Sequence, residues 1–213
     1  MSCHIILVRH GQSEGNEKRV FCGHLDWDIT PLGVKQAERV CEYLKGRKID
    51  AIFSSDLMRA YHTAEPLSRV LHLPITKSKR LRELFAGDWE GKSVSTLLSD
   101  FSASFAVWKS NIGLAHPENG ESVMEVQTRV YKKLTELAQE NEGKTIAVFT
   151  HATPIRSFFA FVRGMACEEM KHLPWASNAS VSEVVFEDGA FQEISYSTDD
   201  FMGELVSYVP KSM

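Results

Sequence analysis

Two histidines follow apolar runs that have the composition of buried β-strands. His10 comes after residues 5–8 (IILV) and Arg9, and His151 comes after residues 146–149 (IAVF) and a threonine. In open α/β sheets, ligands bind beyond the carboxyl ends of the strands, where helix N-termini also point. We therefore expect the two imidazoles and the Arg9 guanidinium at one edge of the sheet, where chemistry takes place.

The loop that follows His10 is rich in glycine and in polar side chains. Gly11 and Gly15 allow the backbone to turn tightly and to expose N–H groups to an oxyanion. Ser13 and Asn16 add side-chain donors to the same loop. A loop of this kind directly after an apolar strand favours a site for an anion.

Strands and helices alternate along the chain, which predicts a layered α/β domain. Apolar runs predict strands at 5–8, 51–55, 74–76, 146–149, 181–186 and 191–196, the third of them at an edge. Apolar residues at helical spacing predict helices at 31–44, 57–71, 95–111, 123–137 and 155–162. Residues 80–120 begin as an irregular loop, so we expect an inserted segment over one end of the sheet.

Several residues predict where these elements begin and turn. Thr30 is expected to cap the first helix, Ser55 or Asp56 the second, and Thr153 the last. The pair at 188–189 (DG) lies between two apolar runs and predicts a hairpin. No repeat interrupts the chain, so residues 1–213 are expected to form one domain with 80–120 as an inserted cap segment.

Four motifs in the same order resemble those of the histidine phosphatase superfamily, in its phosphoglycerate-mutase-like branch. They are residues 9–16 (RHGQSEGN), 54–64 (SSDLMRAYHTA), 81–91 (LRELFAGDWEG) and 150–152 (THA). The resemblance spans nearly the whole chain. It implies a three-layer α/β/α sandwich with a mostly parallel central sheet, phosphoglycerate mutase-like, with an inserted helical lobe over the active site.

The resemblance also implies a role for each residue of the site. His10 is the nucleophile that forms a phosphohistidine, while Arg9, Arg59 and His151 surround the phosphoryl group and spread its charge. Glu83 protonates the leaving oxygen and then activates water. The implied phosphate- or substrate-binding residues are Arg9, Gly11, Ser13, Asn16, Cys22, Gly23, Arg59, His151 and Ala152.

The loop that carries Glu83, residues 82–91 (the acid loop), distinguishes two activities within this family. The family's mutases typically carry a tyrosine and a lysine-bearing continuation after the glutamate, which residues 82–91 lack, so the chain resembles the phosphatases. Residues 117–122 (PENGES) are similar to the phosphatases' PxGES helix start. We expect a metal-independent phosphomonoesterase. The alternatives are a cofactor-dependent phosphoglycerate mutase and a catalytically silent phosphate-binding module, and Asp88 and Glu90 are nearby alternatives to Glu83 as the acid.

The substrate is expected to be a small phosphate ester: a sugar phosphate, a phosphoglycerate, a nucleoside-type phosphate or a phosphoamino acid. The side chains that select among these are expected in residues 20–28, 84–116 and 172–178. The net charge of −4 gives no general attraction to nucleic acid or to an anionic membrane. No cofactor is expected, and the other histidines show no metal-binding spacing. They are His4, His24, His62, His72, His116 and His172.

Three further features bear on surroundings and packing. The four cysteines lie far apart in sequence, and no leader or apolar run marks secretion or a membrane span, so we expect a cytoplasmic monomer or homodimer with free thiols. Trp89, Trp108 and Trp175 are expected in the core, with the pocket wall as the alternative. Residues 200–210 are too apolar for a solvated terminus, so this tail should pack near the active-site mouth, over the sheet or in a dimer contact. The apolar residues are Phe201, Met202, Leu205, Val206, Tyr208 and Val209.

Overall fold

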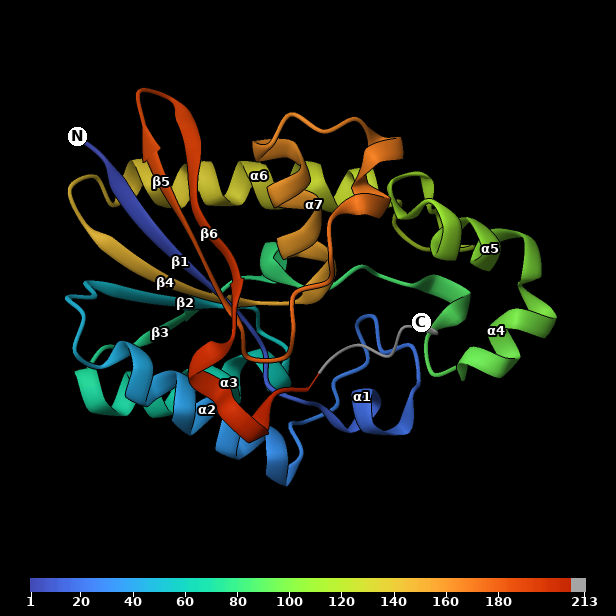
Figure 1. Cartoon of the computed structure of the whole chain (residues 1–213), viewed down its shortest axis with the longest axis horizontal. Helices are drawn as coiled ribbons and strands as arrows, with labels where there is room; N and C mark the ends of the chain where they lie inside the picture. The colour runs from blue at the N-terminus through green and yellow to red at the C-terminus, as the bar shows by residue number, and fades with distance from the viewer. Residues whose placement is uncertain (208–213) are drawn as a thin grey trace.

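The computed structural model describes residues 1–207 and is built around a six-stranded sheet with the order β3-β2-β4-β1-β5-β6 (Figure 1). The strands are β1 (Cys3–Arg9), β2 (Ala51–Ser54), β3 (Ile75–Lys77), β4 (Thr145–Thr150), β5 (Val181–Glu187) and β6 (Ala190–Thr198). β1, β4, β2 and β3 pair in parallel, whereas β5 and β6 are antiparallel. The expected mostly parallel sheet, with β3 at its edge, is confirmed.

The α-helices of the described residues are α1 (Glu14–Lys18), α2 (Pro31–Leu44), α3 (Met58–Leu71), α4 (Val94–Asp100), α5 (Ser102–Ser110), α6 (Val123–Glu140) and α7 (Ala152–Val162). Four of them cover the two faces of the sheet (Figure 1). Figure 1 shows α2 and α3 on one face and α6 and α7 on the other, so the three-layer sandwich is confirmed. Within residues 1–207, no helix has the length and apolar character needed to cross a membrane.

The alternation of side chains along β1 explains why both layers are needed. Successive residues of a strand point to opposite faces of the sheet. Ile5 and Leu7 belong to the apolar cluster under α6 and α7, whereas Ile6 and Val8 belong to the cluster under α2 and α3. All four side chains are completely buried. β1 therefore needs an uninterrupted apolar run, because alternate side chains of the strand pack against each of the two helix layers.

The cap of α2 is as expected, and that of α3 is different. The Thr30 hydroxyl accepts a hydrogen bond from the Gly33 N–H at 3.1 Å. Neither Ser55 nor Asp56 caps α3, which begins at Met58. The Met58 N–H donates instead to the Asp26 carboxylate at 2.6 Å. Asp26 is 32 residues away in sequence, so the loop after α1 supplies the acceptor that the local residues do not.

The sequence also predicted the cap of α7 and the turn between β5 and β6. Thr153 does not cap α7, because His151 occupies the N-cap position and Thr153 lies inside the first turn. Asp188 and Gly189 have φ values of 52° and 81° and join β5 to β6. Two successive residues with positive φ are what a tight hairpin turn demands, so this expectation is confirmed.

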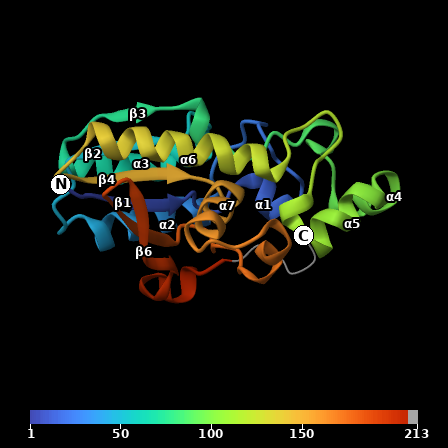
Figure 2. The ribbon, with the colours of Figure 1, turned by 90° about the horizontal axis from the view of Figure 1, so that it is seen from above.

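The segment between β3 and α6 forms the outlying part of the fold. α4 and α5 replace the single helix expected at 95–111, because the backbone at Phe101 leaves the helical region (φ −125°, ψ 34°). In Figures 1 and 2, both helices project beyond the end of the sheet toward which the parallel strands run.

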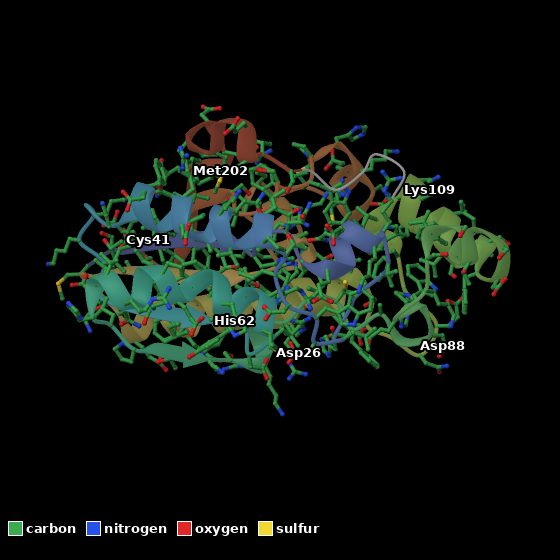
Figure 3. All side chains as sticks on the ribbon, turned by 90° about the horizontal axis from the view of Figure 1, so that it is seen from below. Asp26, Cys41, His62, Asp88, Lys109 and Met202 are labelled. Carbon is green, nitrogen blue, oxygen red and sulfur yellow. The ribbon has the colours of Figure 1, made fainter. Side chains whose placement is uncertain are left out.

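The described part of the C-terminal tail packs against α2. The Phe201 ring stacks on Tyr43 with centroids 4.0 Å apart, and Met202 is buried in the cluster under α2 and α3. The Gln36 side-chain amide donates to the Leu205 carbonyl at 2.7 Å. Figure 3, seen from the side of α2 and α3, shows Met202 on the segment beside α2, with Cys41 on that helix. Tyr208 and Val209, which also entered the expectation, lie outside the described residues.

Candidate active site

A pocket lies where the carboxyl ends of β1 and β4 meet the start of α3, the loop after α1 and the acid loop. Its lining consists of Arg9, His10, Ser13, Asn16, Val20, Phe21, Cys22, Gly23, Arg59, Glu83, Trp108, Ala152, Thr153 and Trp175. Parallel strands bring their carboxyl ends to the same sheet edge, and β1 is paired directly with β4. The residues expected from four separate motifs are therefore brought together.

His10 is held in one orientation and one tautomer. Its Nδ1 lies 2.7 Å from the Gly11 carbonyl oxygen, which only accepts, so Nδ1 carries the hydrogen. The lone pair is then on Nε2. Burial, followed by the charges of Arg59 and Arg9, holds the pKa of His10 well below its usual 6.5. The imidazole is therefore neutral at physiological pH, as a nucleophile must be.

Two guanidinium groups lie beside it, both almost completely buried. Arg9 Nη1 donates to the Ala176 carbonyl at 2.5 Å, and its Nε has no hydrogen-bond partner within residues 1–207. Arg59 donates to the carbonyls of Gly23 at 2.8 Å and Leu25 at 2.9 Å. No carboxylate within residues 1–207 forms a salt bridge with either group. Burial lowers the pKa of Arg9 to about 10 and also lowers that of Arg59, yet both remain cationic at neutral pH and suit an anion.

His151 lies next to His10, although it is not among the residues that line the pocket. The two ring centroids are 5.1 Å apart, and His151 Nε2 lies 2.9 Å from the Ser55 hydroxyl oxygen. Its Nδ1 is buried and, among the described residues, has no hydrogen-bond partner. Burial and the Arg59 charge hold the pKa of His151 well below 6.5. A buried polar atom without a partner is rare, and this one is available to a ligand.

Glu83 is the carboxylate of the acid loop that lines the pocket. Its two oxygens accept from the backbone N–H groups of Leu84 at 2.7 Å and of Thr153 at 3.3 Å. Asp88 and Glu90, the alternatives considered for the acid, do not line it. The Asp88 carboxylate accepts from the Asn119 amide, and that of Glu90 accepts from two backbone N–H groups, including that of His24 at 2.6 Å.

The loop after His10 departs from expectation at Gly11. Its N–H donates to the Thr63 hydroxyl at 2.9 Å, so it does not face an oxyanion, and Gly11 does not line the pocket. A Cβ at this position would lie 2.7 Å from the Gly33 carbonyl oxygen. Close approach of two backbone segments therefore accounts for this glycine. Ser13 and Asn16 both line the pocket and also form the capping box of α1.

Cys22 and Gly23 line the pocket beside Arg59. Gly23 has a φ of 49°, and an added Cβ would lie 2.1 Å from the Glu90 carboxylate. Burial raises the pKa of the Cys22 thiol, so at neutral pH it is a neutral wall of the pocket. All four cysteines are free, and residues 1–207 hold no cluster of His, Cys, Asp and Glu side chains that could bind a metal ion.

The sequence located most of this lining by segment but not by residue. Val20, Phe21, Trp108 and Trp175 lie in the three ranges expected to hold the substrate-selecting side chains, whereas Thr153 was expected only as a helix cap. Trp108 also belongs to the buried core, as expected. Trp89 is indeed completely buried. The apolar lining residues come from segments far apart in the chain, so a one-dimensional pattern cannot separate them from core residues.

Comparison with known sequences agrees with the geometry. The model of the histidine phosphatase superfamily (branch 1) matches residues 5–199. A putative phosphoserine phosphatase 2 of Hydrogenobacter thermophilus is 33% identical over 86% of this chain and 89% of its own length. The adenosylcobalamin/alpha-ribazole phosphatase of Escherichia coli is 30% identical over 78% of this chain and 82% of its own length.

Solved structures show the same fold. The YhfR protein of Bacillus stearothermophilus superposes with a TM-score of 0.90, at 26% identity, covering 94% of this chain and 99% of that one. A mycobacterial glucosyl-3-phosphoglycerate phosphatase gives a TM-score of 0.84 at 27% identity, covering 93% of this chain and all of the other. Sequence, fold and pocket lead to the same conclusion: this chain belongs to the histidine phosphatase superfamily, branch 1, as an enzyme of the phosphomonoester hydrolase type.

Proposed function

We propose that this enzyme hydrolyses small phosphate monoesters through a phosphohistidine on His10, without a metal ion. The observation that carries the proposal is the neutral His10 imidazole, fixed by the Gly11 carbonyl and placed beside two buried guanidinium groups. A neutral nucleophile and two cations suit attack on a phosphate dianion better than any other reaction of this site.

In the first half-reaction, the Nε2 lone pair of His10 attacks phosphorus. The bond from phosphorus to the ester oxygen breaks, its electron pair stays on that oxygen, and the carboxyl group of Glu83 supplies the proton. Arg9 and Arg59 donate to the equatorial oxygens, over which the charge spreads. The product is the alcohol and a phosphohistidine.

In the second half-reaction, the Glu83 carboxylate takes a proton from water as that water attacks phosphorus. The bond between phosphorus and Nε2 breaks, and the electron pair returns to the imidazole. Orthophosphate leaves and Glu83 is again protonated for the next cycle. The same carboxyl group thus acts first as acid and then as base.

His151 serves as a donor to the phosphoryl oxygens. The Ser55 hydroxyl oxygen already accepts from the Leu57 N–H at 3.3 Å, so its own hydrogen is free to be donated to His151 Nε2. Nδ1 then carries the second hydrogen and offers it to the phosphate. In this role the side chain stays neutral throughout, in keeping with its lowered pKa.

The remaining substrate-binding residues of the proposal are Ser13, Asn16, Cys22, Gly23 and Ala152, all of which line the pocket. Gly11 is removed from the set because its N–H is engaged with Thr63. We further propose that residues 1–213 act as a single domain and that 80–120, which contribute Glu83 and Trp108, form its cap. Named relatives act on phosphoserine and alpha-ribazole esters, which brings both within the candidate substrates.

A rapid-quench experiment tests the proposal. With 4-nitrophenyl phosphate labelled at phosphorus, alkaline quench should trap acid-labile, base-stable label on the peptide that contains His10. His10→Ala should lose turnover by about 10³-fold or more, since no neighbour replaces the nucleophile. His172→Ala, at an exposed histidine, serves as the control and should match wild type. Label on Ser13 or Cys22, or full activity of His10→Ala, would contradict the mechanism.

The metal-free part of the proposal has its own test. Arg9 and Arg59 supply the positive charge that a divalent ion supplies in other phosphatases. Activity should therefore stay within about twofold after exhaustive treatment with EDTA. Loss of activity that Mg²⁺ or Zn²⁺ restores would show that the cationic side chains are not sufficient.

A further inference from the structure

The pocket has a charged end and an aromatic wall. The wall consists of Val20, Phe21, Trp108 and Trp175, which come from the loop after α1, from α5 and from the segment after α7. Phe21 and Trp108 meet edge to face with ring centroids 5.1 Å apart. Trp108 and Trp175 are tilted against each other, with centroids 5.7 Å apart. The three rings form one continuous apolar surface beside the proposed phosphoryl position.

The rings of this wall are held in position by neighbouring side chains. Trp108 packs against the completely buried Trp89, with centroids 6.0 Å apart. The Arg156 guanidinium lies 4.3 Å from the Trp175 ring centroid and donates to the Met170 carbonyl at 3.0 Å. A guanidinium over an indole ring is attracted to it, most strongly where water is excluded, and Arg156 is 5% exposed. The wall is therefore preformed, which spares a ligand the cost of ordering it.

The charges of the lining restrict what the alcohol part of the ester can carry. Among the described residues, Arg9 and Arg59 are the permanently cationic side chains of the pocket, and the proposed reaction assigns both to the phosphoryl group. Glu83, the acid of the proposed reaction, supplies no positive charge. A carboxylate or a second phosphate on the alcohol would lose water and find no cation, and an unpaired buried charge is costly.

We propose that the physiological substrate is a phosphomonoester whose alcohol bears an uncharged aromatic or similarly flat apolar group, bound on the wall formed by Phe21, Trp108 and Trp175. Aromatic pairs favour offset stacking or edge-to-face contact, and both are available on a surface of tilted rings. The inference rests on the proposed phosphatase function and adds a substrate class to it. It separates nucleoside-type esters of this kind from phosphoserine and phosphoglycerate.

The test compares esters of alcohols that leave with similar difficulty, so that leaving-group chemistry does not enter. Benzyl phosphate and 2-naphthylmethyl phosphate are measured against glycerol 1-phosphate, O-phosphoserine and 3-phosphoglycerate. We expect kcat/KM for the two aryl-methyl esters to exceed the others by about tenfold or more, mostly through KM. Equal or higher kcat/KM for phosphoserine or phosphoglycerate would overturn the inference.

Failure of this inference is distinguishable from failure of the function. If 4-nitrophenyl phosphate and all five esters are inert, the phosphatase proposal fails. If 4-nitrophenyl phosphate is hydrolysed and the charged esters are preferred, the phosphatase stands and the aromatic subsite is wrong.

Variants of the wall give a second, independent test. Trp175→Leu should lower kcat/KM for benzyl phosphate about tenfold and for glycerol 1-phosphate less than twofold, whereas Trp175→Phe should retain most of the preference. Val20→Arg supplies the missing cation and should raise kcat/KM for 3-phosphoglycerate about tenfold. Unchanged inhibition by orthophosphate would show that the charged end is intact in each variant. Ile194→Ala, at a residue 54% exposed on β6, is the matched control.

If Trp175→Leu does not fold, Val20→Arg still decides. An unchanged kcat/KM for 3-phosphoglycerate in Val20→Arg would contradict the proposal, and so would an unchanged preference for benzyl phosphate in a folded Trp175→Leu.

Discussion

At the scale of single residues, the two imidazoles of the pocket have the same charge state and different tasks. His10 donates its Nδ1 hydrogen to a backbone carbonyl and has its lone pair on Nε2, whereas His151 has Nε2 on a hydroxyl and an Nδ1 that has no partner among the described residues. In each ring, the hydrogen bond made by one nitrogen leaves the other nitrogen for the phosphoryl group of the proposed reaction. The positive charge of the site therefore comes from Arg9 and Arg59, which do not titrate near neutral pH.

Glu83 is the residue whose importance should depend on the substrate. An alkyl alkoxide leaves only when protonated, whereas a nitrophenolate leaves almost unaided. Glu83→Gln keeps the shape but removes proton transfer, commonly worth about 10²–10⁴-fold. We expect a large loss in the rate of phosphoenzyme formation with benzyl phosphate and a much smaller loss with 4-nitrophenyl phosphate, both measured by rapid quench.

Breakdown of the phosphoenzyme should slow with both esters, because the same carboxylate activates the water. Asp88→Asn, at an exposed carboxylate of the same loop, is the control and should leave both esters unaffected. Equal losses of phosphoenzyme formation in Glu83→Gln would mean that Glu83 only positions the phosphate.

At the scale of elements, α6 holds the acid loop through one side chain. Arg129 donates to the carbonyls of Arg82 and Glu83, each at 2.8 Å, and pairs with the Glu121 carboxylate at 2.7 Å. The fork of the guanidinium reaches all three at once, which a lysine ammonium cannot do. Arg129 thus positions Glu83 through the backbone, without touching the substrate.

Arg129→Lys should therefore resemble a mild form of the Glu83 variant. We expect kcat for benzyl phosphate to fall about tenfold, with KM nearly unchanged and with a smaller effect on 4-nitrophenyl phosphate. The matched control is Arg80→Lys, because Arg80 forms an exposed ion pair with Glu136 of α6. Equal losses on both esters would indicate a general structural role rather than positioning of the acid.

Elements also show where prediction from sequence succeeds and where it stops. The apolar runs and the hairpin pair identified all six strands to within two residues at each end, because burial and positive φ act on neighbouring residues. Motif order located His10, Arg59 and Glu83 at one pocket, with His151 next to His10. The α3 cap could not be found, because its acceptor, Asp26, is brought there by the tertiary fold. The segments that form the aromatic wall were expected, but the individual rings were not assigned to it, because their side chains satisfy core and pocket patterns alike.

At the scale of the whole molecule, burying neutral histidines makes stability depend on pH. The pKa values of His10 and His151 lie well below 6.5 in the folded protein, whereas both return to about 6.5 on unfolding. As pH falls through that value, the unfolded chain binds protons that the folded chain does not. The free energy of unfolding should then decrease, by up to about 1.4 kcal/mol per pH unit for each histidine.

Urea unfolding between pH 7.5 and 5.5 checks this. His151→Gln should show a shallower loss of stability than wild type over this range, since one titrating group is gone. Glu183, whose pKa is lowered to about 2 chiefly by its hydrogen bonds with Arg47, loses its contribution only as pH falls below about 4.5, so it does not confuse the comparison. Parallel curves for the two proteins would contradict the assignment.

The charged end of the pocket is buried and the aromatic wall is partly exposed. This difference in burial also sets the order in which the products leave. His10, Arg9 and Arg59 are nearly inaccessible, whereas Phe21 and Trp175 are only half-buried. In the proposed reaction, the alcohol rests on the wall and leaves first, and orthophosphate leaves last and competes with the next ester. An alcohol that lingers on the wall occupies the space through which water approaches, and it is itself an acceptor for the phosphoryl group. The affinity of the wall for the alcohol therefore sets the balance between hydrolysis and transfer of the phosphoryl group back to an alcohol.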